Sequence, residues 1–234
     1  MEQIYTIPIN EAFEKSAADS SCGCPFCSIF KTFEQRELEL ILGASMMEPD
    51  VRIKTNESGF CKEHYSMLLS LGKKLPLALI LESHLDNIRD MIKANNLLPA
   101  VSAKKTVQSL TKLNDSCYIC DRLQNIFSNV IDNAAYLFGV DPEFKKKCAA
   151  QPYFCLPHYA AFLSAGKNTL KGSQFNEFYK CIYNIESKYI NSVKDNVSFF
   201  VKKFDYRYEN EPWGDAKDAV EKALEALTGE YPKH

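Results

Sequence analysis

Apolar residues recur along the chain with the period of an α-helix. Residues 121–138 carry them at intervals of three and four, on one face of a 3.6-residue repeat, and a glycine follows as a typical helix end. Residues 76–92 and 173–204 show the same spacing, and the latter predicts the longest helix of the chain. Its predicted apolar face consists of Phe175, Phe178, Tyr179, Ile182, Ile185, Tyr189, Val193, Val197, Phe200 and Phe204.

Capping residues predict shorter helices in the remaining segments. Asp141, followed by a proline, is typical of a helix start, with the aspartate as cap and the proline in the first turn. Asp215 is expected to cap a last helix that ends at Gly229, and Asn10 a short helix over residues 11–16. Only residues 51–55 look extended. The predicted fold class is therefore all-α, a bundle of helices.

A four-ligand motif occurs twice in the chain. Each copy begins with C-x-x-C and ends with F-C-x-x-H-Y. Between the C-x-x-C pair and the third cysteine lie 33 residues (28–60) in one copy and 34 (121–154) in the other. Three thiols and one imidazole are the ligands that tetrahedral zinc takes in a closed structural site. The sequence thus predicts two zinc ions, one in each copy. The ligands are Cys24, Cys27, Cys61 and His64 in the first copy, and Cys117, Cys120, Cys155 and His158 in the second.

The repeat also predicts the domain organisation. Residues 1–95 would form the first zinc-stapled helical unit, and residues 115–234 the second, which includes the long helix and the last one. The intervening residues 96–114 are polar and contain a proline, so we expect a linker with a short helix over residues 103–113. Within each unit, one ion would join two helix starts about 33 residues apart.

Two other interpretations of the eight residues are open. They could be thiols and imidazoles buried in a helical core, but that does not explain the shared spacing. Cysteine ligands with a histidine can also hold an iron–sulfur cluster. We favour zinc because two closely spaced pairs suit a single tetrahedral ion.

Composition limits the cellular setting and the class of partner. The net charge is −2 and no basic cluster is present, which argues against nucleic acid as the partner. No apolar run approaches the roughly 20 residues that span a bilayer, and no signal peptide is visible. The cysteines number nine, an odd count, and most of them fall in C-x-x-C and C-x-x-H groups, which indicates metal ligands in a reducing compartment rather than disulfides. We therefore expect a cytoplasmic protein without membrane contact.

Four further residues could be taken for metal ligands. Cys22 lies two residues before the first C-x-x-C pair and has no counterpart in the second copy, so we interpret it as a spare thiol. Cys148 and Cys181 are expected in the core. His84 lies on the apolar face predicted for residues 76–92, which favours a hydrogen-bonded core histidine.

The segment that follows the long helix contains the only tryptophan of the chain. Asp205 and Arg207, with the neighbouring aromatic residues, could line a polar cleft. We favour the alternative, in which Trp213 and the tyrosines fix the last helix to the bundle.

Several of these motifs together resemble a known family. They are CPFC, DVRIKTNESGFCKEHY, CYIC, FCLPHY and the KFDYR…PWG segment near the end, so the resemblance covers nearly the whole chain. The chain is similar to uncharacterised cytoplasmic proteins of anaerobic Gram-positive bacteria with a duplicated C-x-x-C…F-C-x-x-H-Y motif. The resemblance implies a bacterial cytoplasmic metal protein and supplies no catalytic residues.

The sequence favours a non-enzymatic function. Catalytic zinc keeps three protein ligands and one water, whereas each copy here offers four protein ligands. We expect a zinc-binding helical module that binds a protein or small-molecule partner. One alternative is a thiol and zinc redox sensor, because oxidation of thiolates ejects zinc. The other is an iron–sulfur electron-transfer protein.

Overall fold

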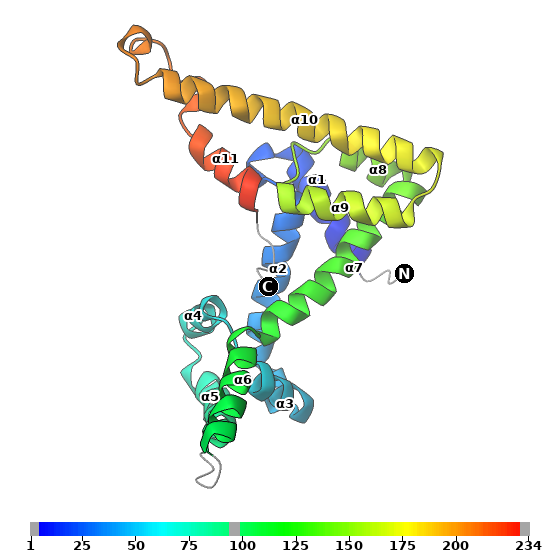
Figure 1. Cartoon of the computed structure of the whole chain (residues 1–234). Helices are drawn as coiled ribbons and strands as arrows, with labels where there is room; N and C mark the ends of the chain where they lie inside the picture. The colour runs from blue at the N-terminus through cyan, green and yellow to red at the C-terminus, as the bar shows by residue number, and fades with distance from the viewer. Residues whose placement is uncertain (1–4, 94–98, 230–234) are drawn as a thin grey trace. The chain divides into compact units, whose positions relative to one another are not determined.

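The computed structural model describes residues 5–93 and 99–229, and helices make up most of these ranges (Figure 1). Eleven α-helices and four short 3-10 segments follow one another in the described residues, and no strand occurs among them. The predicted all-α fold is confirmed.

The chain divides into two compact units that are not consecutive in sequence. The first unit contains the described residues 5–31 and 126–229, and the second contains residues 32–93 and 99–125. The second unit is therefore inserted within the sequence of the first.

This division differs from the predicted one of two consecutive units joined by a linker at residues 96–114. Residues 99–114 form helix α6 (Pro99–Asn114), which belongs to the second unit. Helices α2 (Pro25–Ile41) and α7 (Tyr118–Val140) contribute residues to both units. The predicted boundaries assumed that each motif copy folds on itself, and the ligand grouping described below is different.

The first unit is built around phenylalanine rings. The ring of Phe13 packs 4.8 Å from that of Phe144 and 5.3 Å from that of Phe26, measured between centroids. Tilted and edge-to-face ring pairs of this kind stabilise the fold beyond the hydrophobic effect of burying the rings. The helices are α1 (Thr6–Ala18), α8 (Pro142–Ala149), α9 (Leu156–Thr169), α10 (Ser173–Lys202) and α11 (Ala219–Thr228), with the start of α2 and most of α7. Both α9 and α11 pack on α10, and α1 packs on α8.

The second unit has a largely aliphatic core, and an ion pair links two of its helices. Arg122 on α7 donates from Nε and Nη2 to the carboxylate of Glu37 on α2, at 2.6 and 3.1 Å. This bidentate geometry is the strong form of the interaction. The helices are α3 (Pro49–Ser58), α4 (Lys62–Ser70), α5 (Lys74–Met91) and α6, with the end of α2 and the start of α7. Core residues include Leu38, Ile41, Leu68 and Ile80.

The extended segment predicted at residues 51–55 is wrong, because these residues lie in α3. Proline at the first helical position and Gly59 at the C-cap, with φ of 57°, define the helix locally. The alternation of β-branched residues does not reflect two faces of a strand. Ile53 is 55% exposed, whereas Thr55 on the same helix is buried.

Two predicted helix caps are also wrong. Asn10 lies inside α1, where its side chain donates to the Thr6 carbonyl at 3.0 Å. Asp215 belongs to a 3-10 turn at Gly214–Ala216, and α11 begins only at Ala219. The cap at Asp141 is confirmed, since its carboxylate accepts from the next two backbone N–H groups of α8.

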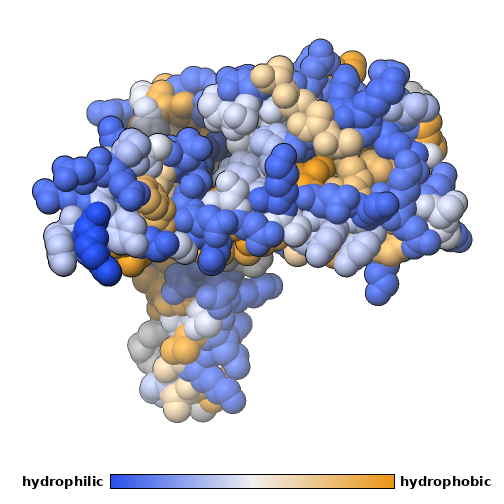
Figure 2. Space-filling view, turned by 90° about the horizontal axis from the view of Figure 1, so that it is seen from above, coloured by the Kyte–Doolittle hydropathy of each residue, from blue (hydrophilic) through white to orange (hydrophobic). Residues whose placement is uncertain are grey.

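On the face of the molecule in Figure 2, hydrophilic residues cover most of the surface and hydrophobic residues form separate patches. Within residues 5–93 and 99–229, none of the helices combines the length and the apolarity that a bilayer-crossing segment needs.

Candidate metal centres

The structure brings the eight predicted ligands together as two groups of four. In each group the four ligand atoms all lie within 4.8 Å of one another. The pairing is the reverse of the predicted one, because each C-x-x-C pair meets the C-x-x-H pair of the other motif copy. The first group is Cys24, Cys27, Cys155 and His158, and the second is Cys61, His64, Cys117 and Cys120.

The first group lies at the starts of α2 and α9 in the first unit. Cys24 immediately precedes α2 and Cys27 is in its first turn, while Cys155 is the N-cap of α9. The Nδ1 atom of His158 is 3.0, 3.4 and 3.6 Å from the sulfurs of Cys155, Cys27 and Cys24. The sulfurs of Cys27 and Cys155 are 3.6 Å apart. The ring of Phe127 packs on the imidazole at a centroid distance of 5.0 Å and fixes its orientation.

The second group repeats this arrangement at the starts of α4 and α7. The Nδ1 atom of His64 is 3.1, 3.3 and 3.4 Å from the sulfurs of Cys61, Cys117 and Cys120. The sulfurs of Cys61 and Cys120 are 4.0 Å apart. As in the first group, the C-x-x-H pair opens a helix, with Cys61 as the N-cap.

Backbone contacts explain why the second C-x-x-C pair meets the first C-x-x-H pair. The N–H of Tyr118 donates to the carbonyl of Gly59 at 3.0 Å, and the Ser116 hydroxyl donates to the carbonyl of Ser58 at 2.8 Å. These bonds align the segment before α4 with the segment before α7. The ligands that follow in each segment are therefore directed at one another.

Glu34 on α2 adds a carboxylate behind His64. Its Oε1 atom lies 3.3 Å from Nε2 of the imidazole, in ion-pair range but not aligned as a hydrogen bond. A carboxylate behind a ligating histidine orients the ring and raises its basicity. No sequence signal points to Glu34, because it is 30 residues from His64 and belongs to neither motif.

The distances fit a tetrahedral ion. With Zn–S of about 2.3 Å and Zn–N of about 2.0 Å, a regular tetrahedron places two sulfurs about 3.8 Å apart and a sulfur and a nitrogen about 3.5 Å apart. The sulfur–sulfur distances of 3.6 and 4.0 Å lie on either side of the first value. The sulfur–nitrogen distances range from 3.0 to 3.6 Å. Disulfides are excluded at these separations, and all nine cysteines are free thiols.

Electrostatics within the second group also favour a cation. A hydrogen bond from the Cys120 thiol lowers the pKa of Cys117 to about 3, and the same contact raises the pKa of Cys120. Burial opposes protonation of His64, but the contacts with Cys117 and Glu34 outweigh it and raise its pKa to about 10. Without a cation, these groups must share protons. A divalent ion replaces the protons and compensates the thiolate charge.

Gly229 closes the first group from the end of α11. Its φ is 55°, and a Cβ atom there would lie 2.2 Å from the Cys155 sulfur and 3.5 Å from that of Cys27. Only glycine permits this approach. The sequence predicted Gly229 as a helix end, which is confirmed, but not as a neighbour of the ligands.

Cys22 lies outside the first group, as predicted. It lines a cavity of about 240 Å³ beside the group, together with Cys24, Cys27 and Tyr153. The spare thiol is thus close to two ligands without being one of the four.

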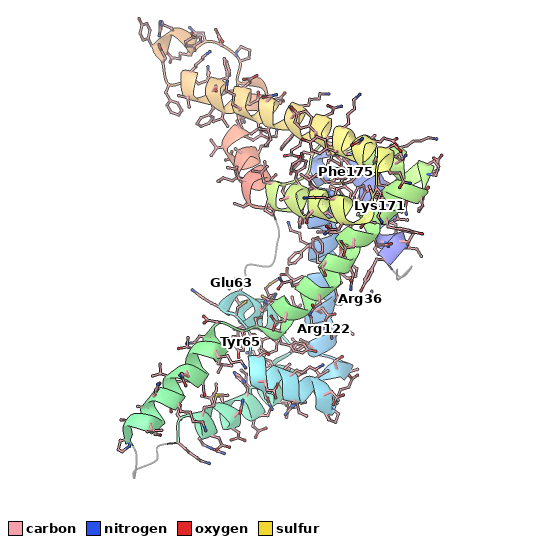
Figure 3. All side chains as sticks on the ribbon, turned by 45° about the vertical axis from the view of Figure 1, so that its right-hand side comes forward. Arg36, Glu63, Tyr65, Arg122, Lys171 and Phe175 are labelled. Carbon is pink, nitrogen blue, oxygen red and sulfur yellow. The ribbon has the colours of Figure 1, made fainter. Side chains whose placement is uncertain are left out.

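His84 is a core histidine, as predicted. It is buried, and its Nδ1 lies 3.0 Å from the carbonyl of Asn56. Glu63 is exposed on α4 beside the ligand histidine, and Figure 3 shows it with Tyr65 on this helix. Tyr65 packs edge-on against Phe60, at 5.3 Å between centroids.

The polar residues after α10 pair locally rather than across a cleft. Arg207 donates to the carboxylate of Asp205 at 2.6 Å, and Trp213 packs on Phe200 of α10 at 5.5 Å between ring centroids. Lys203 donates to three carbonyls of the following turn, those of Tyr208, Glu209 and Glu211, at 2.7 to 2.8 Å. These contacts fold the segment back onto the end of α10.

Comparison with known proteins identifies the family. The model of a family of unknown function (DUF6062) matches residues 1–234, so the chain belongs to this family. No curated protein and no solved structure matches it.

Proposed function

We propose that this member of the family is a zinc protein, in which two closed tetrahedral sites stabilise a helical binding module. The observation that carries the proposal is the convergence of three sulfurs and one imidazole nitrogen within 4.8 Å, in both groups. Soft thiolates with one imidazole form a donor set that suits zinc. Cys24, Cys27, Cys155 and His158 would hold one ion, and Cys61, His64, Cys117 and Cys120 the other.

The compactness of each group favours a single ion over an iron–sulfur cluster. A cluster distributes its protein ligands over two or more iron atoms, so ligands on different irons lie farther apart than ligands of one ion. Here no two ligand atoms of a group are more than 4.8 Å apart. That spacing leaves room for one metal ion at the centre.

Four protein ligands per ion support a structural rather than a catalytic role. A catalytic zinc keeps one position for water or substrate. With both sites closed, the function we propose is binding of a protein or small-molecule partner. The net charge of −2 disfavours nucleic acid as that partner. The nine free thiols support a reducing compartment, the cytoplasm.

Metal analysis tests the zinc assignment. The protein, purified without oxygen, is expected to contain two zinc ions per chain and to be colourless. The variants Cys27→Ser and Cys61→Ser should each lose one ion, whereas Cys22→Ser, the matched control, should retain both. Iron with sulfide, or a metal content that none of the ligand variants changes, would contradict the proposal.

Cobalt substitution tests whether the sites are closed. Co²⁺ in a site with three thiolates and one imidazole gives the intense visible bands of tetrahedral coordination. We expect these bands to be unchanged when cyanide or free imidazole is added, because no position is open. Band shifts with a saturable dependence on the added ligand would indicate an open position and a catalytic site.

A further inference from the structure

Three cysteines remain outside the two metal groups, and the structure brings two of them together. They are Cys148 on α8 and Cys181 on α10, two helices that pack on each other, and each thiol perturbs the pKa of the other. The third, Cys22, lies beside the first metal group. The sequence separates Cys148 from Cys181 by a whole helix, α9, so their contact could not be predicted from spacing.

An ion pair one turn away shows how the two helices align. Lys145 Nζ on α8 lies 2.8 Å from Glu177 Oε2 on α10. Cys148 is three residues after Lys145, and Cys181 is four residues after Glu177. Residues at these spacings share a helix face. The two thiols therefore lie on the helix faces that the ion pair joins.

The two thiols differ in exposure and in acidity. Cys148 is fully buried, whereas Cys181 is partly exposed. The hydrogen bond from the Cys148 thiol lowers the pKa of Cys181, and Lys145 contributes in the same direction. The contact with Cys181, together with burial, raises the pKa of Cys148. An accessible thiolate next to a buried thiol is the arrangement of a redox-active pair.

We propose that Cys148 and Cys181 form a redox dithiol that closes reversibly to a disulfide between α8 and α10, independently of the metal groups. The oxidant class is a hydroperoxide. The Cys181 thiolate attacks the O–O bond, becomes a sulfenic acid and releases hydroxide, or alkoxide from an organic peroxide. The Cys148 sulfur then displaces hydroxide from the Cys181 sulfur, and its proton leaves with the hydroxide as water. With hydrogen peroxide, two thiols yield one disulfide and two waters, and a dithiol reductant reverses the reaction.

The consequence for the molecule is a covalent link that holds α10 to α8. The link would close a loop that contains α9 and its N-cap, and with them His158 and Cys155 of the first metal group. It consumes none of the six ligand cysteines, so zinc can stay bound while the pair is oxidised. This separates the proposal from zinc-ejecting oxidation of the metal ligands.

The first test uses the full-length, metal-loaded wild-type protein. After one equivalent of hydrogen peroxide, remaining thiols are blocked with N-ethylmaleimide in denaturant, and the digested protein is mapped by mass spectrometry. We expect a peptide pair linked through Cys148 and Cys181 that dithiothreitol separates, and no zinc release to a chromogenic chelator. The proposal is overturned if both cysteines are recovered alkylated while other cysteines are oxidised.

Variants test which cysteine reacts first. In Cys148→Ala, dimedone should label Cys181 after peroxide, because the sulfenic acid is no longer resolved. In Cys181→Ala, dimedone labelling of Cys148 after peroxide should not exceed that of untreated protein. The control Cys22→Ser should form the Cys148–Cys181 disulfide as the wild type does. Dimedone on Cys148 but not Cys181 would refute the assigned roles. The wild-type mapping decides the proposal even if a variant fails to fold, and it does so whether or not the bound metal is zinc.

Discussion

Replacing Glu186 with glutamine should stabilise the protein at neutral pH. Glu186 lies on α10, is 5% exposed, and accepts a hydrogen bond from the backbone N–H of Phe154 at 3.2 Å. Burial raises the pKa of this carboxyl group from 4.5 to about 7. Because the amide oxygen of glutamine can accept the same hydrogen bond, Glu186→Gln removes the ionisable group and keeps the contact.

The sign follows from proton linkage. The folded-state pKa lies above the unfolded value, so the unfolded chain loses this proton between pH 4.5 and 7 while the folded protein keeps it. The stability of the wild type therefore falls as pH rises through this window. One pKa unit corresponds to about 1.4 kcal/mol of unfolding free energy. Compared with the difference between variant and wild type in acid, the unfolding free energy of Glu186→Gln should rise relative to wild type by roughly 1 kcal/mol at pH 5 and by about 3 kcal/mol above pH 7.5.

Urea unfolding of wild type and variant from pH 5 to pH 8.5, with equal metal content verified, measures the difference in unfolding free energy. Asp195→Asn is the matched control, since Asp195 is an exposed carboxylate on the same helix, and it should change stability by less than about 0.5 kcal/mol. A difference between Glu186→Gln and wild type that stays constant with pH, or narrows as pH rises, would refute the reasoning.

Three further substitutions probe the sites and the core. Gly229→Ala should release the first metal ion, as read by metal analysis, because the added Cβ would collide with Cys155. The control is Gly172→Ala, where φ is a similar 54° and no atom lies within 4 Å of the added Cβ, so it should only lower the unfolding free energy by about 1 kcal/mol. Glu34→Gln should weaken metal binding at the second group about 10- to 100-fold in a chelator competition, and leave the first group unchanged. Phe13→Ala should lower the unfolding free energy by about 3–5 kcal/mol in urea, and a loss below 1 kcal/mol would contradict its central position in the core.

The helices were predictable where the determinants are local. The apolar faces predicted at residues 76–92, 121–138 and 173–204 correspond to α5, α7 and α10, because a helix must turn its apolar face to a core whatever that core contains. At the end of the last range, α10 stops at Lys202, and Phe204 lies beyond it and is 78% exposed. The prediction of an extended segment at residues 51–55 was wrong because it rested on the alternating β-branched residues there. The proline before the segment and the glycine after it favour a helix.

The ligand residues were predictable as types and spacings, but their grouping was not. Which C-x-x-C pair meets which C-x-x-H pair depends on tertiary contacts such as the bond from the Tyr118 N–H to the Gly59 carbonyl. The positions of Glu34 and Gly229 depend on the same tertiary structure, since each approaches its group from a distant helix. A sequence repeat therefore indicates what the groups contain without fixing how they are connected.

The crossed grouping has a consequence for the chain as a whole. When two copies of a motif exchange ligand pairs reciprocally, the ligands are shared in the pattern of an isologous homodimer, where residue i of one subunit meets residue j of the other and the reverse. Here both subunits of such a dimer correspond to halves of one polypeptide. A cut anywhere between residues 65 and 116 leaves each fragment with two ligands of each group. Neither half holds all four ligands of a group, so in the proposed zinc protein the two ions, and not only the peptide bond, would join the halves of the chain.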